Sequence, residues 1–200
     1  MAVEYEIKFL DADLVRVREE LTKCGAVCSQ PERFMRRTIF DFPDQRLGAI
    51  HAWVRLRDEG DQVTLSYKQF KSQDIDGMQE VELVVHDYET GAAFLAAIGL
   101  QPRSIQESKR ETWVCEGVTI TLDTWPWLPP FIEIEAATET EVRNFVEQLG
   151  YAWEQGVFGG IVEVFKQYYE VTSDEINQMK ELCFTPMPDW LLARKREKSS

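Results

Sequence analysis

Charged and apolar residues alternate along several short segments of this chain, and this alternation limits the possible folds more than any other feature. In Glu4–Lys8 every second residue is charged and the residues between them are apolar. The pattern returns at Arg55–Arg57, Glu80–Glu82 and Glu133–Glu135. Because successive side chains of a β-strand point to opposite faces, each segment predicts a strand with one charged face and one apolar face. The chain is therefore predicted to form a sheet with one charged face.

Strand-like segments recur over the first two thirds of the chain. They lie near residues 3–10, 34–42, 50–58, 62–70, 78–86, 107–115, 117–123 and 131–136. Asp58–Asp61 separates the third segment from the fourth, and Glu116–Gly117 separates the sixth from the seventh. Both connections contain turn-forming residues, so we expect a β-hairpin at each.

Amphipathic helices are expected between and after these strands. The candidate segments lie around residues 14–24, 94–98, 138–149, 161–169 and 172–182. Thr138–Glu141 and Thr172–Glu175 have the pattern of helix-capping boxes. Gly25, Gly99 and Gly150 are suitable stops for three of the helices. Residues 161–169 are rich in Val and Phe, which are less typical of a helix.

The charged face of the sheet has two alternative locations. It can be the solvated outer face of an antiparallel sheet, which is the ordinary arrangement for a single strand. The expected helices, however, need an apolar surface to cover, and about eight antiparallel strands are enough to close a barrel. The prediction is therefore an α+β fold, an eight-stranded antiparallel β-barrel with helices packed outside. We expect one domain over residues 1–183 and a C-terminal tail over 184–200.

Composition excludes several functional classes. The formal net charge of −13 argues against general nucleic-acid binding, which needs a broad basic surface. No apolar run approaches the roughly 20 residues that cross a bilayer, and the acidic N-terminus does not resemble a signal peptide. The four cysteines lack metal-binding spacing, so we expect reduced thiols in a cytoplasmic protein.

Charges enclosed in a barrel are costly unless they are paired or bound to a ligand, and their types here suit phosphate. Arginine contacts phosphate oxygens in pairs, and lysine acts as a compact positive charge. Clustered carboxylates bind hard cations such as Mg²⁺ or Mn²⁺. No glycine-rich phosphate loop is present, so side chains would hold the phosphates. Of Arg36 and Arg37, one faces inward; Arg37 is either a phosphate contact or a salt bridge at the rim.

The order of these motifs resembles the CYTH superfamily, also called triphosphate tunnel metalloenzymes. Glu4–Lys8 is similar to the ExExK signature of that family. The other matching motifs follow in the same order as Arg55–Arg57, Val63–Lys68, Glu80–Glu82, Lys109–Arg110, Leu122–Asp123 and Phe131–Glu135. The resemblance covers residues 3 to about 169 and implies a tunnel that grips a triphosphate and one or two divalent metal ions.

Functional residues carried over by position fall into three groups. The phosphate contacts implied by the resemblance are Lys8, Arg55, Arg57, Lys68 and Arg110, with Arg37 and Lys109 as further candidates. The implied metal ligands are Glu4, Glu6, Asp123, Glu133 and Glu135. The implied catalytic residues are Glu80 and Glu82, as metal ligands through water or as base for the nucleophile, together with Lys8. Lys109 and Arg110 are adjacent, so a regular strand turns only one of them inward, and we favour Arg110.

The resemblance leaves the reaction open. The leading hypothesis is metal-dependent hydrolysis of tripolyphosphate, a nucleoside triphosphate or thiamine triphosphate. Cyclisation of ATP to cyclic AMP is the alternative within the same fold, and a non-catalytic polyphosphate or nucleotide binder is the alternative outside enzymes. Both a monomer and a homodimer are compatible with the sequence.

Five residues outside these motifs are further candidates. His51 and His86 are expected to be structural or surface residues. Trp125 and Trp127 flank a rigid turn that packs at the tunnel mouth or stacks on a base. Lys166 is a candidate for a further lysine that faces the substrate.

Overall fold

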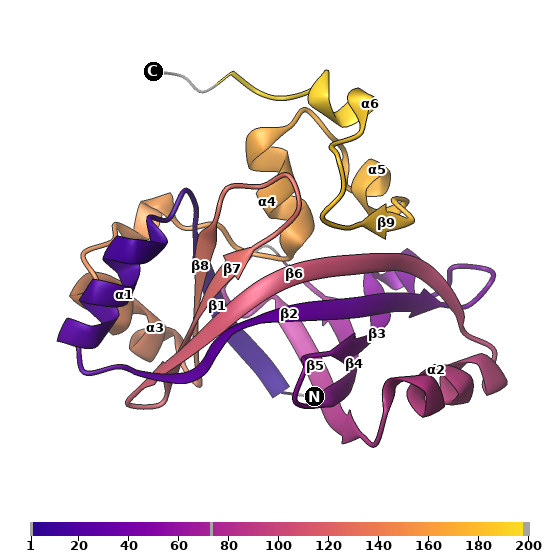
Figure 1. The fold of residues 1–200 in the computed structure, drawn as a ribbon, viewed down its shortest axis with the longest axis horizontal. Coiled ribbons are helices and arrows are strands. Elements are labelled where there is room, and N and C mark those ends of the chain that lie inside the picture. Colours follow the sequence, from indigo (N-terminus) through magenta and orange to yellow (C-terminus); the bar gives the residue numbers. More distant parts are fainter. Residues whose placement is uncertain (1, 73, 198–200) are drawn as a thin grey trace.

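The computed structural model describes residues 2–72 and 74–197, with only the backbone described for 2–4. Eight strands dominate it (Figure 1). They are β1 (Ala2–Phe9), β2 (Val27–Asp41), β3 (Ala52–Asp58), β4 (Val63–Phe70), β5 (Met78–Val85), β6 (Gln101–Cys115), β7 (Val118–Thr124) and β8 (Phe131–Ala136). A short ninth strand, β9 (Glu181–Leu182), pairs in parallel with β6.

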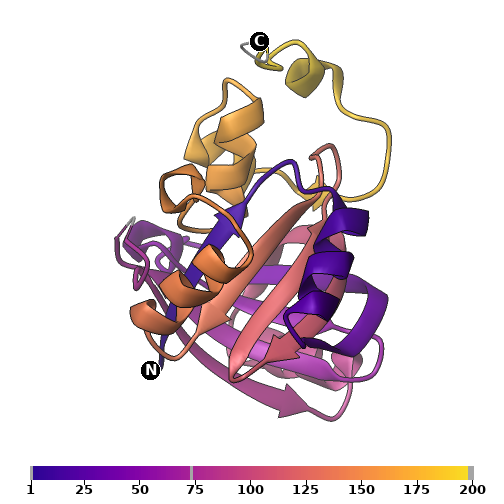
Figure 2. The same cartoon turned by 90° about the vertical axis from the view of Figure 1, so that its left-hand side faces the viewer.

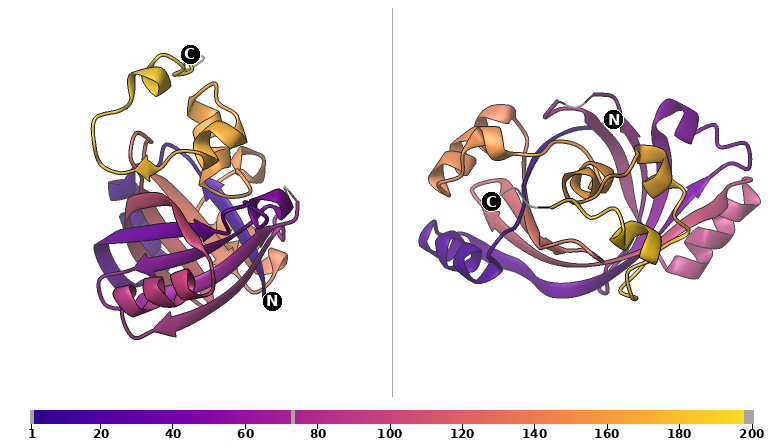
Figure 3. Two further views of the ribbon diagram at one scale, coloured as in Figure 1. Left: turned by 90° about the vertical axis from the view of Figure 1, so that its right-hand side faces the viewer. Right: turned by 90° about the horizontal axis from the view of Figure 1, so that it is seen from above.

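The eight long strands are joined into a continuous ring of antiparallel pairs. Their order is β2-β3-β4-β5-β1-β8-β7-β6, and β6 pairs again with β2. The ring is uneven, because β1 pairs with β5 over three residue pairs but with β8 over five. The sheet is thus curled around a central space rather than closed uniformly, as the view from above shows (Figure 3). The predicted eight-stranded antiparallel arrangement is confirmed.

Strand direction defines the two ends of the ring. Because all eight pairings are antiparallel, the β7–β8 connection and the β3–β4 turn lie at opposite ends. We call the end with the β7–β8 connection, residues 125–130, the upper mouth. We call the end with the β3–β4 turn, residues 59–62, the lower mouth, and the space between them the lumen.

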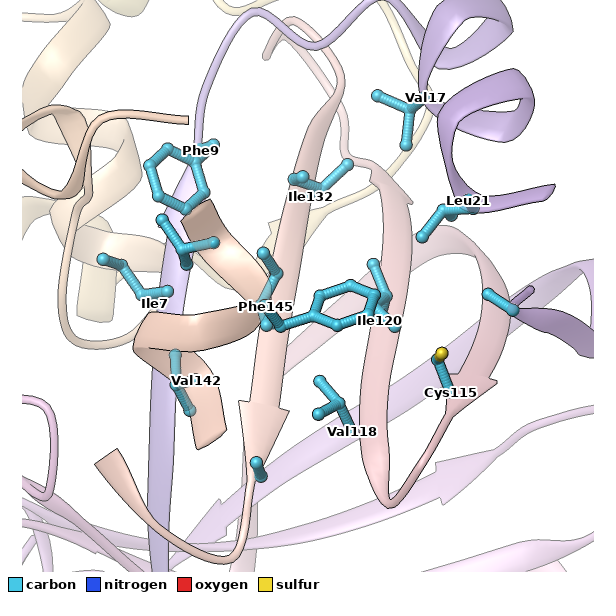
Figure 4. Packing of buried hydrophobic residues seen from close by; sticks show 14 of the residues in the cluster. Ile7, Phe9, Val17, Leu21, Cys115, Val118, Ile120, Ile132, Val142 and Phe145 are labelled. Atoms are coloured by element: carbon cyan, nitrogen blue, oxygen red, sulfur yellow. The ribbon is translucent and has the colours of Figure 1, made fainter. Parts of the chain in front are cut away.

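Two helices cover the apolar outer face of one side of the ring. α1 (Leu14–Lys23) and α3 (Glu139–Gln148) lie side by side over β6, β7, β8 and β1 (Figure 2). Leu21 and Phe145 pack against Ile7, Ile120 and other buried residues there (Figure 4). The Asp13 side chain accepts hydrogen bonds from the amides of residues 15 and 16, which caps α1. Burial of this apolar layer leaves the opposite, charged face of the strands for the lumen.

α2 (Tyr88–Ala97) covers β3 on the other side of the ring. The contact is close at Gly91, where an added Cβ would lie 2.8 Å from Leu56 Cδ1. A side chain at this position would displace the buried Leu56. Glycine therefore allows α2 to approach the sheet.

The upper mouth is covered by the C-terminal part of the chain. α4 (Ile161–Tyr168) lies over the opening in the view from above (Figure 3). Phe165 and Tyr169 pack with Trp125 and Phe131 of the β7–β8 region in a second core. α5 (Ser173–Asn177) and α6 (Asp189–Leu192) extend this core, and Leu191 is fully buried. The Trp127 indole donates a hydrogen bond to the carbonyl of residue 185 at 2.8 Å.

Most predicted elements are found, but several bounds differ. The two predicted hairpins join β3 to β4 and β6 to β7. β2 and β6 begin earlier than predicted, at Val27 and Gln101. The two strands pair with each other along nearly their whole length, and this pairing includes their polar N-terminal parts. α5 ends at Asn177 instead of continuing to Leu182, which lies in β9. No helix in residues 2–72 and 74–197 is long and apolar enough to span a membrane.

Candidate functional site

The charged faces of the strands point into the lumen. Lys8, Arg57 and Asp123 are charged, yet they are buried. Each directly follows a buried apolar residue of its strand, so its side chain points to the face opposite the hydrophobic core. Buried charges of this kind need partners. The structure therefore favours the enclosed location of the charged face over the solvated one.

Cations and carboxylates are paired along β1, β8, β7 and β6, which we call the acidic side of the lumen. Lys8 Nζ lies 2.8 Å from Glu6 Oε1 and 2.6 Å from Glu133 Oε1. Strand register causes this proximity, because Lys8 pairs directly with Glu133 in the β1–β8 ladder. Burial alone would lower the pKa of Lys8, but the two carboxylates outweigh it and raise the pKa. Lys8 is therefore protonated at neutral pH.

Arg110 is the second cation of the acidic side. It donates to both carboxylate oxygens of Asp123 at 2.8 Å and to Glu133 at 2.7 Å. Burial opposes its charge, yet Asp123 and Glu133 raise the pKa of Arg110. Lys109 is 47% exposed and lies 3.9 Å from Glu32 on the outer surface. Arg110 is thus the lumen residue of the pair, and the prediction that Lys109 contacts substrate was wrong because strand alternation turns it outward.

Glu135 marks a surplus of negative charge on the acidic side. It pairs with Glu6 across β1 and β8. Burial, followed by repulsion from Glu6 and Glu133, raises the pKa of Glu135. A cation near these three carboxylates would relieve that repulsion, and carboxylate oxygens are suitable donors for Mg²⁺ or Mn²⁺.

The predicted metal ligands are only partly assembled. Glu4 lies in β1, but its side chain is outside the described part of the chain. Within residues 2–72 and 74–197, no three His, Cys, Asp or Glu side chains are arranged to hold a metal ion. The chemistry of Glu6, Glu133 and Glu135 fits a divalent cation, and their side chains would have to converge further to coordinate one.

Arginines dominate the opposite side of the lumen, on β2 to β5, which we call the arginine side. Arg55 Nη2 lies 3.0 Å from both Glu80 and Glu82. Lys68 lies 2.9 Å from Glu80. Arg57 lies 3.5 Å from Glu82, a longer contact. The predicted phosphate contacts and the predicted catalytic glutamates are therefore neighbours.

Arg37 is the least compensated of these cations. It is buried, donates to Ser108 Oγ and lies 4.4 Å above the Trp125 ring. Among the residues that the structure describes, no carboxylate pairs with it. Burial and then the positive charges of Arg57, Arg55 and Arg110 lower the pKa of Arg37 well below its usual value. Since arginine remains protonated in proteins, this lowered pKa means that the positive charge of Arg37 lies in an unfavourable positive potential. The salt bridge at the rim, one of the two roles expected for Arg37, is not formed among the described residues.

Other groups on the arginine side have an unfavourable charge or an unpaired hydrogen-bonding atom. Burial and the nearby Arg55 lower the pKa of Arg57 to about 10. Arg37 Nε, Arg55 Nε and Ser66 Oγ are buried without a hydrogen-bond partner in the described part of the chain. Buried polar groups are rarely left unpaired in native proteins. Together these groups favour an anion as the missing partner.

Sequence reasoning missed two lumen residues. Glu59 was assigned to a turn, and Arg33 fell outside the predicted second strand. Both continue the two-residue spacing of inward positions, Glu59 after Arg57 and Arg33 before Arg37, and this spacing is the signal that could have found them. Trp125 was considered as a stacking surface for a base, but its ring is buried against Arg37.

The remaining candidates lie away from the lumen cations. His51 and His86 are exposed, in agreement with a surface role. Lys166 lies in α4 and pairs with Glu163 at 2.8 Å. It is thus positioned over the upper mouth as part of an ion pair.

Comparisons with known proteins agree with this architecture. The model of the CYTH domain family matches residues 2–176. No curated protein matches the sequence. A structure from Pyrococcus horikoshii has a TM-score of 0.66 at 18% identity, and the match covers 80% of this chain and 98% of that one.

Two further structures carry functional names. A candidate adenylate cyclase from Vibrio parahaemolyticus has a TM-score of 0.70 at 12% identity and covers 82% of this chain and 98% of its own. A candidate adenylyl cyclase from Hippeastrum, with dominant triphosphatase activity, has a TM-score of 0.58 at 15% identity and covers 80% and 91%. At such identities the three structures establish the fold alone.

Proposed function

Because the chain belongs to the CYTH domain family, we propose that it is an enzyme that hydrolyses a triphosphate inside the lumen. The observation that carries this proposal is Arg37, a buried arginine without a carboxylate partner among the described residues and close to three other arginines. A polyphosphate supplies the several closely spaced negative charges that such a group of arginines needs. A neutral ligand would leave Arg37 without a countercharge.

In this proposal the lumen cations have two roles. Arg37 and Arg55 bind phosphate oxygens with the Nε donors that the described part of the chain leaves unpaired, and Arg57 adds positive charge beside them. Lys8 and Arg110 already have carboxylate partners and contribute positive charge at fixed positions. Fixed charges stabilise the charge that develops on the transferred phosphoryl group without reorganisation.

A divalent metal ion is proposed as the cofactor on the acidic side. Glu6, Glu133, Glu135 and Asp123, with Glu4, would hold Mg²⁺ or Mn²⁺. Such an ion offsets phosphate charge and orients water near the phosphoryl group. The repulsion that raises the pKa of Glu135 supports a cation at this place.

Glu82 is the better candidate of the two predicted bases. Its side chain is 36% exposed, compared with 12% for Glu80. Arg55 and Arg57 keep it beside the proposed phosphate position. A carboxylate there accepts a proton from the attacking water.

Hydrolysis is favoured over the two alternatives. Cyclisation of ATP requires recognition of adenine, and the aromatic ring considered for that role, Trp125, is occupied by Arg37. The Hippeastrum relative, a candidate cyclase, has dominant triphosphatase activity. A non-catalytic binder would gain little from the carboxylates that line the acidic side.

The test is a product assay with Mg²⁺ or Mn²⁺ and a panel of tripolyphosphate, ATP, GTP and thiamine triphosphate. We expect orthophosphate release that a chelator abolishes and that Lys109→Ala, on the outer surface, leaves unchanged. Cyclic AMP with pyrophosphate would replace hydrolysis by cyclisation. Tight binding without any product would assign the protein to the binders.

A further inference from the structure

Glu59 is a buried carboxylate at the lower mouth of a lumen that otherwise presents arginines there. It follows Arg55 and Arg57 at the spacing of inward positions, and only 4% of the residue is exposed. Arg57 Nε donates to Glu59 Oε1 at 2.8 Å, and Arg33 Nη2 donates to Oε2 at 3.2 Å. Thr64 Oγ1 donates to Oε1 at 3.1 Å. Three inward side chains from three strands thus hold one negative charge in place.

The surroundings of Glu59 keep it charged and fixed. Burial acts to raise its pKa, but Arg57 and Arg33 outweigh burial, so the pKa lies below its usual value. Arg33 Nε is itself buried without a hydrogen-bond partner in the described chain. If Glu59 moved away, the half-buried Arg33 would lose its countercharge, which is unfavourable.

We propose that Glu59 ends the phosphate-binding track at Arg57 and restricts this protein to short linear polyphosphates such as tripolyphosphate. The inference rests on the proposed function. A phosphate group placed beyond Arg57, toward the lower mouth, would lie next to the Glu59 carboxylate. The two negative charges would repel each other. At the other end, α4 lies over the upper mouth (Figure 3), and its Phe165 belongs to the same buried core as Trp125 and Phe131.

A purely structural role for Glu59 makes a different prediction. If Glu59 only ties the β3–β4 turn to β2, its loss weakens the site for every phosphate chain alike. If it sets the end of the track, its loss changes the ratio between long and short chains. The ratio of two substrates on one protein therefore separates the two roles.

The experiment compares wild type, Glu59→Gln and Asp61→Asn, with kcat/KM measured for tripolyphosphate and for long-chain linear polyphosphate. We expect wild type to prefer tripolyphosphate by about tenfold or more, and Glu59→Gln to lose most of this preference through a gain on the long chain. Asp61 lies in the same turn but is exposed and bonded to Gln30, so Asp61→Asn should keep the wild-type ratio. A melting curve for each variant checks that it is folded.

Two results would overturn the proposal. One is equal use of both chain lengths by wild type, which decides the matter even if Glu59→Gln does not fold. The other is an equal loss of activity on both substrates in a folded Glu59→Gln protein. Absence of any turnover by wild type contradicts the proposed function instead. Calorimetric binding of tripolyphosphate and of the long chain, to wild type and to Glu59→Gln, then applies the same ratio test without catalysis.

Discussion

The two sides of the lumen differ in the partners of their buried cations. On the acidic side, Lys8 and Arg110 each lie within 2.8 Å of two carboxylates. On the arginine side, Arg37 has a hydroxyl and an aromatic ring as partners instead of a carboxylate. The acidic side therefore stabilises itself, whereas Arg37 on the arginine side requires a ligand for its compensation. Residues of the first kind should matter for folding, and residues of the second kind for binding.

The largest expected effect is on the acidic side, with Arg110→Met. Removal of Arg110 leaves Asp123, which is fully buried, and Glu133 without their shared cation. Breaking a buried ion pair by removing one partner typically costs about 3–5 kcal/mol, so we expect a loss of this size in the free energy of unfolding. Urea denaturation measures it. A variant as stable as wild type would contradict the view that the acidic side stabilises itself.

Arg37→Met should have the opposite profile. Among the residues that the structure describes, its loss leaves no carboxylate unpaired, and it removes a charge that burial and three arginines disfavour, so the melting temperature should stay the same or rise. Loss of a charge-assisted contact of about 1.5–3 kcal/mol should weaken tripolyphosphate binding roughly 10- to 100-fold. Thermal melts and calorimetry on the same sample test both expectations. If Arg37→Met melts well below wild type, Arg37 belongs with the stabilising residues and the comparison fails.

Glu135→Gln should give the smallest change in the free energy of unfolding. It tests whether Glu135 is the one carboxylate, among the described residues of the acidic side, that lacks a cation. Because its pKa is raised, charged Glu135 destabilises the fold at neutral pH; this penalty decreases as pH falls through its folded-state pKa and disappears below its lower unfolded-state pKa. The variant should therefore be more stable than wild type by about 1 kcal/mol at neutral pH and by less in acid. Mg²⁺ should raise the melting temperature of wild type more than that of the variant. An equal effect of Mg²⁺ on both proteins would remove Glu135 from the proposed ligands.

Much of the fold followed from the two-residue alternation. The strands around Lys8, Arg57, Glu80 and Glu133 were predictable because their charged and apolar residues alternate without interruption. The early part of β2 was not, since polar residues lie on both of its faces and register shifts interrupt the pairing between Cys28 and Arg33. This part of β2 pairs with β6 alone, because the pairs between β2 and β3 begin at Arg36.

The charged residues of the candidate site were also predictable, but their pairing was not. Alternation correctly turned Arg110 inward, because direction depends only on local geometry. The missing countercharge of Arg37 depends on which strands become neighbours and in which register, and these are properties of the whole ring. Glu59 was missed for a different reason: it continues the two-residue spacing after Arg57, but its position beside a glycine assigned it to the turn.

The position of β1 in the ring has a consequence for how the chain folds during synthesis. β1 is made before the other seven strands of the ring, yet residue 5 pairs with residue 136 and residue 4 pairs with residue 78. Until β5 and β8 leave the ribosome, the first strand has no partner for its hydrogen bonds. Contacts between such distant parts of a chain make folding slow and leave edges exposed to aggregation in the meantime. The charged residues at every second position of β1 keep that waiting strand from pairing with other chains.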